Sequence, residues 1–373
     1  MKTTQRGMSL IEIMVGVVIG LIGCVVIFQM YMVAEGRKRT VSSGSDMEIS
    51  GRLGLMSLER DLQAAGYGYG VAASGTATVA GPALGCNVIA HDTARPVPDF
   101  TYIFAPVVIT DGAAGAPDSI AVLRGSSSFL AIAKIIDSGS ATSTRVKADT
   151  GGRTGVSKGD VILNVHRAVG PPAVHQCAMF AITDDTNPDQ LTLDHAGGAS
   201  RYNKGSGFAL GGEGRLYNLG AAPVRNIWSI AGNRLVVSND LAWSAAPQEV
   251  ADSVINLQAQ YGIDNAGPSG PDGIVDVWTD AAPADWTQVL AVRFALLTRS
   301  PQWERDRLYE RDGTPNPPAP RWSASADAPF VMTNVDGTAD DDPADTTNNW
   351  RHYRYNVFEA VVPLRNTILG RQL

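Results

Sequence analysis

Residues 7–34 read GMSLIEIMVGVVIGLIGCVVIFQMYMVA, and this stretch decides how the chain is organised. From residue 13 to residue 34, only Gln29 and Tyr31 carry polar side-chain groups. As a helix these residues extend about 33 Å, which is enough to cross the hydrocarbon core of a membrane. The other interpretation is a buried helix of a soluble protein, but few core helices are apolar on every side over such a length.

A secretory signal peptide is a competing explanation for this apolar segment. Such signals have an apolar region of about 7–15 residues, followed by a small-x-small cleavage site. The apolar segment here is longer, and Ala34-Glu35-Gly36 offers only a poor version of that site. The chain then continues with apolar residues at helical spacing, which are Ile49, Leu53 and Met56 in one set and Leu55, Leu58 and Leu62 in another.

Together these segments predict one helix from residue 8 to residue 65, which Gly66 ends. At the usual rise per residue it would be about 87 Å long. Its first half is apolar on every side, whereas its second half is amphipathic. We therefore expect the second half to pack on a folded head.

Glu12 is an acid at the edge of the apolar block. A carboxylate in that position is costly to insert into a membrane and normally has a partner. The alternative is that Glu12 lies in the headgroup layer, where the cost is small. Three glycines in the block permit close helix approach through small faces, or are ordinary membrane-helix glycines; they are Gly16, Gly20 and Gly23.

The stretch GMSLIE, residues 7–12, resembles the processing site of type IV prepilins. That family has a short basic leader ending in Gly, then an apolar helix with Glu at the fifth mature position. The resemblance implies that a membrane-embedded prepilin peptidase cleaves after Gly7 and methylates the new amino group of Met8. The family usually has Phe at the position of Met8.

The resemblance also implies a role for Glu12 in assembly. Glu12 lies about one helical turn after Met8, so the carboxylate of one subunit can meet the amino terminus of the next when parallel helices stagger. Such a pair offsets part of the desolvation cost. Basic residues alone do not set the orientation, since Lys2 and Arg6 precede the segment and residues 37–39 follow it. The resemblance places the leader in the cytoplasm and the large domain outside.

After residue 66 the chain has short apolar runs separated by turn-forming residues, which is typical of strands and loops. The expected strands are residues 102–109, 119–123, 161–165, 178–182, 234–237, 254–261, 288–297 and 355–364. The 39 Gly and 21 Pro exclude a coiled coil or a helical array. We expect an α+β, type IV pilin-like fold, with a leader (1–7), a long helix (8–65, spanning the membrane at 13–34) and a large antiparallel β-rich head (66–373).

Several segments of the head resemble PilW-type minor pilins. They are the junction between helix and head at residues 51–67, two central segments at 156–163 and 177–183, and two late segments at 292–300 and 362–366. One alternative is a J-type minor pseudopilin of a type II secretion system. Another is a membrane-anchored module that binds sugars or surface ligands through its long loops.

The chain contains three cysteines. Cys24 lies inside the apolar segment and serves there as a small apolar residue. Cys86 and Cys177 both fall in the head, and outside the cytoplasm two such thiols tend to pair. We therefore expect a disulfide between them, with two separate buried thiols as the alternative.

An acidic turn in the head is a candidate calcium site. Residues 261–265 (YGIDN) and 272–276 (DGIVD) place the carboxylates of Asp264, Asp272 and Asp276 around glycines. Oxygen ligands in such a turn are the chemistry that Ca²⁺ prefers. The simpler interpretation is a solvated Asp-Gly turn, since the fixed order of an EF-hand is absent. No other cofactor is expected.

The sequence contains no Gly-x-Ser-x-Gly elbow, no Walker loop and no zinc-like spacing among its five histidines. A formal charge of −7 argues against nucleic-acid binding. We expect a non-enzymatic minor pilin that helps to initiate or cap a type IV pilus and supports piliation, twitching motility and adhesion.

The resemblance implies a set of partners for such a subunit. They are other minor pilins, the major pilin, the prepilin peptidase, the inner-membrane assembly platform and a tip adhesin. It also implies a single span in the inner membrane with the head in the periplasm before assembly, and a place on the pilus at the cell surface afterwards.

Overall fold

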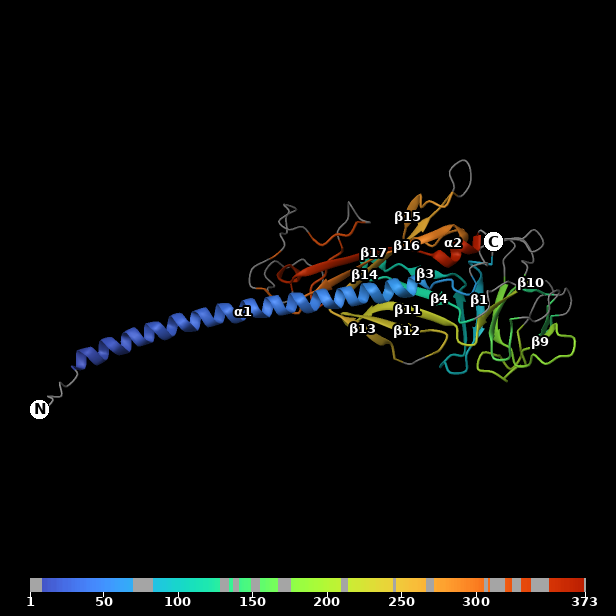
Figure 1. Ribbon diagram of the computed structural model, residues 1–373, viewed down its shortest axis with the longest axis horizontal. Helices are drawn as coiled ribbons and strands as arrows, with labels where there is room; N and C mark the ends of the chain where they lie inside the picture. Colours follow the sequence, from blue (N-terminus) through green and yellow to red (C-terminus); the bar gives the residue numbers. More distant parts are fainter. Residues whose placement is uncertain are drawn as a thin grey trace, which may run out of the picture.

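The computed structural model describes residues 9–69, 83–127, 134–136, 141–148, 155–166, 176–208, 214–243, 246–265, 272–304, 308, 319–323, 330–336 and 349–371, and all structural statements concern these. The predicted leader (1–7), with Gly7, and the adjoining Met8 lie outside this described part. A long helix projects far out of a β-rich head, as the sequence predicted (Figure 1). The α+β, pilin-like fold class is therefore confirmed.

The helix α1 (Leu10–Gln63) is continuous over 54 residues, with Ser9 at its N-cap. Shortly after it ends, Gly66 takes φ +76°, a conformation that glycine adopts without strain. The backbone N–H of Gly66 then donates to the carbonyl oxygen of Leu123 at 2.9 Å. α1 ends two residues before the predicted end at residue 65.

The head consists of strands and a few short helices. The strands are β1 (Asn87–His91), β2 (Asp99–Ile103), β3 (Val107–Thr110), β4 (Ser119–Arg124), β5 (Lys134–Ile135), β6 (Arg145–Lys147), β7 (Val161–His166), β8 (Gln176–Ala181), β9 (Thr192–Asp194), β10 (Gly214–Gly220), β11 (Val224–Ala231), β12 (Arg234–Asn239), β13 (Gln248–Asp252), β14 (Val254–Ile263), β15 (Val277–Thr279), β16 (Val289–Arg299) and β17 (Tyr355–Pro363). The short helices are η2 (Ala113–Gly115), η3 (Trp286–Gln288), η4 (Trp350–His352) and α2 (Arg365–Arg371).

These strands form three larger sheets and a small one. The six-stranded sheet has the order β2-β1-β8-β7-β10-β5, and the five-stranded sheet has the order β13-β12-β11-β4-β3. The four-stranded sheet is β15-β14-β16-β17, and β6 pairs with β9. Among the described strand pairs, only β1 and β8 run parallel, so the head is antiparallel-rich as expected.

One predicted strand is wrong. Residues 102–109 are divided between β2 and β3, which belong to different sheets. Pro106 lies between the two strands and has no backbone N–H to donate. Its carbonyl oxygen accepts from the N–H of Leu123 at 2.9 Å, so the chain changes sheets there.

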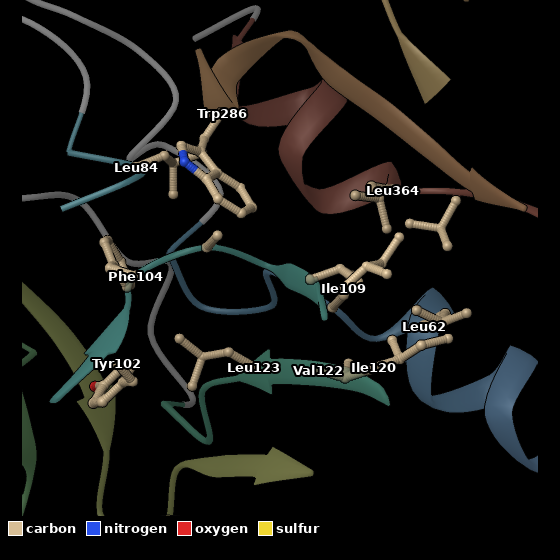
Figure 2. Close-up of a cluster of buried hydrophobic side chains, with 14 of the residues drawn as sticks. Leu62, Leu84, Tyr102, Phe104, Ile109, Ile120, Val122, Leu123, Trp286 and Leu364 are labelled. Carbon is tan, nitrogen blue, oxygen red and sulfur yellow. The ribbon is translucent and has the colours of Figure 1, made fainter. Parts of the chain in front are cut away.

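The second half of α1 packs against β13, β16 and β17. Its buried face is Met47, Gly51, Gly54, Leu58 and Leu62. Gly51 permits the closest approach, because a Cβ atom there would lie 2.1 Å from the Phe358 ring of β17. Figure 2 shows Leu62 near the end of α1 beside Ile120 and Val122 of β4.

Asp61 fixes the end of α1 to the five-stranded sheet. Its Oδ2 accepts hydrogen bonds from Nδ2 of Asn226 and from Nε1 of Trp228, each at 2.8 Å. Its Oδ1 lies 3.6 Å from Nε of Arg124. Trp228 is buried, so its indole N–H depends on this carboxylate for a partner.

Asp118 joins the five-stranded sheet to the four-stranded sheet. Its N–H donates to the carbonyl oxygen of Leu257 at 2.8 Å. Its carboxylate accepts from the backbone N–H of Ala259 at 2.7 Å and of Gly112 at 2.9 Å. Burial raises the pKa of Asp118 to about 6 despite these donors. Asp118 thus helps to hold the two sheets in register, together with the buried Tyr261 hydroxyl, which bonds the backbone of Ile109 in β3.

We predict that Asp61→Ala lowers the free energy of unfolding of the head by about 2 kcal/mol, because a buried indole donor and a half-buried amide lose their acceptor. Urea unfolding of the full chain in detergent, followed by tryptophan fluorescence, measures this. Glu48→Ala is the matched control, since Glu48 makes only an exposed pair with Arg52. Equal stability of the two variants would contradict the proposed attachment.

Candidate assembly site

Among the residues described, the first half of α1 has none that is buried. Its apolar side chains are exposed all round, with Leu10 exposed by 74% and Ile19 by 65%. It is the one described helix that is long and apolar enough to cross a membrane. The predicted span, residues 13–34, lies wholly within α1.

Glu12 lies in the first turn of α1. Its backbone N–H donates to the carbonyl oxygen of Ser9 at 3.0 Å, and the residue is exposed. Within the described part of the chain, no cationic side chain pairs with its carboxylate. A partner for Glu12 in a low-dielectric setting would therefore have to come from another molecule or from the chain terminus.

The predicted disulfide between Cys86 and Cys177 is present in the structure, and its two Cα atoms are 6.2 Å apart. Both cysteines are buried. Cys177 stands opposite Val88 in the parallel pairing of β1 with β8, so the bond fastens this pairing at its beginning. Cys24 is a free thiol, exposed on the apolar half of α1.

In the acidic turn, the carboxylates accept hydrogen bonds from backbone N–H groups. Asp264 is fully buried, and its Oδ2 accepts from the N–H of Gly273 at 3.0 Å. Asp276 accepts from the N–H of Asn265 at 3.1 Å, and Asp272 from the N–H of Ile274 at 2.9 Å. Among the residues described, no group of three or more His, Cys, Asp or Glu side chains is placed to hold a metal ion. The calcium site therefore has no support from the described geometry.

Among the described histidines, His195 has the pKa that departs most from its usual value. It is buried, and its ring stacks on the Phe180 ring with the centroids 4.0 Å apart. Burial lowers the pKa of His195 to about 4, so the ring is neutral near pH 7. It packs in a second apolar cluster that includes Ile162 and Leu193. His195 is therefore a residue of the core.

Sequence reasoning missed Asp61, which anchors the helix to the head. A signal for it was available, because Asp61 lies on the same helical face as Leu58 and Leu62. A carboxylate among the apolar positions of an amphipathic helix needs a partner when that face is buried. No sequence signal pointed to Asn226 and Trp228 as those partners.

Two known families match separate parts of the chain. The prokaryotic N-terminal methylation motif matches residues 2–28, and the type IV pilus-assembly protein W family (PilW) matches residues 233–366. No curated protein and no solved structure matches. The methylation motif and the apolar helix α1 indicate the class of a membrane-anchored pilin. Within that class, the two matches together support a type IV pilus minor pilin of the PilW family.

The PilW match covers the strands on which α1 packs, since β13, β16 and β17 all lie within residues 233–366. The segments 292–300 and 362–366 fall inside it. The segments 51–67, 156–163 and 177–183 lie outside both matches, so their resemblance stays a prediction. Both families are structural components of pili, which is consistent with a protein that is not an enzyme.

We predict that replacing Cys86 and Cys177 together by Ser lowers the free energy of unfolding by about 4–5 kcal/mol, because the bond closes a long loop. The two cysteines are 91 positions apart. Thermal unfolding with and without reductant measures the loss. Cys24→Ser is the control and should leave the melting temperature of the head unchanged. A double variant as stable as the parent would show that the pairing of β1 with β8 does not need the bond.

Proposed function

We propose that this chain is a non-enzymatic structural subunit that is cleaved after Gly7, methylated on Met8 and assembled with other minor pilins and the major pilin. It initiates or caps a type IV pilus, and through the pilus it supports twitching motility and adhesion. Its processing uses the prepilin peptidase, its assembly uses the inner-membrane platform, and a tip adhesin contacts its head.

One observation carries this proposal: α1 is continuous, yet among the described residues only its second half packs against another part of the chain. A helix that is apolar all round needs lipid or other apolar helices about it. Before assembly, residues 13–34 span the inner membrane and the head lies in the periplasm. After assembly, the same residues pack in a bundle of helices and the head is displayed on the pilus.

In this arrangement, the proposed domains are a leader (1–7), a helix (8–65) and a head (66–373). Glu12 pairs with the methylated amino terminus of a neighbouring subunit. Charge pairing in a bundle penalises every register that leaves the carboxylate without a partner. Glu12 thus selects the axial stagger between neighbouring helices.

We expect Gly7→Ala to block cleavage, because the peptidase recognises the residue before the scissile bond. Mass spectrometry of the chain isolated from membranes would then find the leader still attached. Gly16→Ala is the control: Gly16 lies in the apolar block beyond the cleavage site, so this variant should be processed normally. Normal processing of the Gly7 variant would refute the proposed cleavage site.

We expect Glu12→Ala to leave processing intact but to reduce the number of pili per cell by about tenfold or more, as for an unpaired buried charge. Electron microscopy of pili and a twitching assay, in a strain that carries only the variant copy, measure this. Glu48→Ala removes an exposed acid from the head-bound half of the helix and should leave pilus number unchanged. Unchanged piliation in the Glu12 variant would refute the charge pairing.

A further inference from the structure

Between the apolar half of α1 and its first buried residue lies a stretch of helix that is mostly exposed. The first residue of α1 that the head buries is Met47. We call residues 35–46 the neck; most of them are exposed, and Thr40, Ser43 and Gly44 are among the few that are half-buried. Three consecutive basic residues, Arg37, Lys38 and Arg39, lie on this neck and are all exposed. We call these three residues the basic collar.

Successive residues of an α-helix are rotated by about 100°, so the basic collar covers roughly 200° of the circumference of the neck. At least one of its cations therefore faces outward, whichever side of the helix meets another protein. Arg39 is partly neutralised, because its Nε lies 3.2 Å from Oε1 of Glu35. Arg37 and Lys38 take part in no ion pair among the described residues.

The position of the basic collar along α1 sets its height above the membrane. The apolar segment ends at Ala34, and Arg37 lies about 4.5 Å further along the helix axis. The headgroup layer of a bilayer is about 5–8 Å thick on each side of the hydrocarbon core. When the apolar segment spans the membrane, the basic collar therefore lies at the level of the lipid phosphates on the side of the head.

We propose that the basic collar binds anionic lipid headgroups in the leaflet on the side of the head, so that the unassembled subunit selects acidic lipids as its neighbours. This inference rests on the proposed function, since it requires the apolar segment to span a membrane. Lipid phosphates match the chemistry of Arg and Lys donors. Exposed cations at this height gain electrostatic attraction from an anionic surface.

Cleavage of the leader changes which side of the apolar segment carries the basic residues. The leader carries Lys2 and Arg6, and cleavage after Gly7 removes both. The mature chain then keeps no Lys or Arg before the apolar segment. Electrostatic attachment to lipid is balanced between both faces of the membrane in the precursor, whereas in the mature subunit it comes mainly from the side of the head.

The test is the lipid selectivity of the full chain in vesicles of zwitterionic phosphatidylcholine with a small amount of spin-labelled lipid. Electron spin resonance separates lipids in contact with the protein from bulk lipids. We expect spin-labelled phosphatidylglycerol to associate roughly fivefold more strongly than spin-labelled phosphatidylcholine, an effect of about one unpaired charge. The preference should weaken in high salt, as exposed charges are screened.

The double variant Arg37→Gln/Lys38→Gln should keep only the weaker preference that the leader cations Lys2 and Arg6 give. Arg52→Gln/Arg60→Gln is the matched control, because it removes the same charge from the same helix. Arg52 lies about 22 Å further along the helix axis than Arg37, away from the membrane. The leader is identical in all three proteins, so its contribution cancels. Equal association of the two lipids with the parent chain, or a collar variant with the same preference as the control, would overturn the inference.

A protease-protection assay on the same vesicles keeps this inference distinct from the proposed function. Protection of residues 13–34 with no lipid preference overturns only the binding by the basic collar. Digestion of the apolar segment overturns the membrane span, and with it both proposals.

Discussion

The whole structure depends on the attachment of one face of α1 to the head. Five buried positions and the carboxylate of Asp61 hold residues 47–62 against the sheets. This attachment holds the second half of the helix, and the first half projects from the head as a continuation of the same helix. Without it, an isolated helix would have only its intrinsic propensity, and most helical stability in proteins comes from tertiary packing. The head therefore determines the direction in which the apolar half leaves the protein.

The contact between helix and head depends on small residues as well as on large ones. Gly51 admits the ring of Phe358, and Gly54 faces the methyl groups of Leu235 and Leu296. Glycine inside a helix lowers its intrinsic stability, so these residues need a packing reason. Here the reason is the short distance between the helix backbone and the sheet. In contrast, a Cβ at Gly44, on the neck, would meet no atom within 4 Å.

The sequence predicts those features of the fold that depend on residues close together in the chain. The apolar block, the amphipathic repeat around Leu58 and the stop at Gly66 are local patterns, and the structure confirms the helix they predict. The disulfide followed from the small number of cysteines and the expected compartment, and it too is present. Strand pairing is set by contacts between distant residues, so β10 and β11 were missed although β10 is wholly buried. Asn226 and Trp228 as partners of Asp61, and Ala259 as a partner of Asp118, were likewise out of reach, because each is more than 100 residues away in the chain.

The part of the head that matches the PilW family differs from the unmatched part in how it contacts α1. The matched region contains the strands that receive α1, and the contact between helix and head constrains the residues on both sides of it. The six-stranded sheet is built from residues 87–220 and lies outside both matches. Its strands make few contacts with α1, and the Cys86–Cys177 bond and its own pairings hold it together. Side chains of this sheet such as Val88 and Tyr217 nevertheless lie in the same apolar core as Leu62 of α1, so packing also links the sheet to the end of the helix.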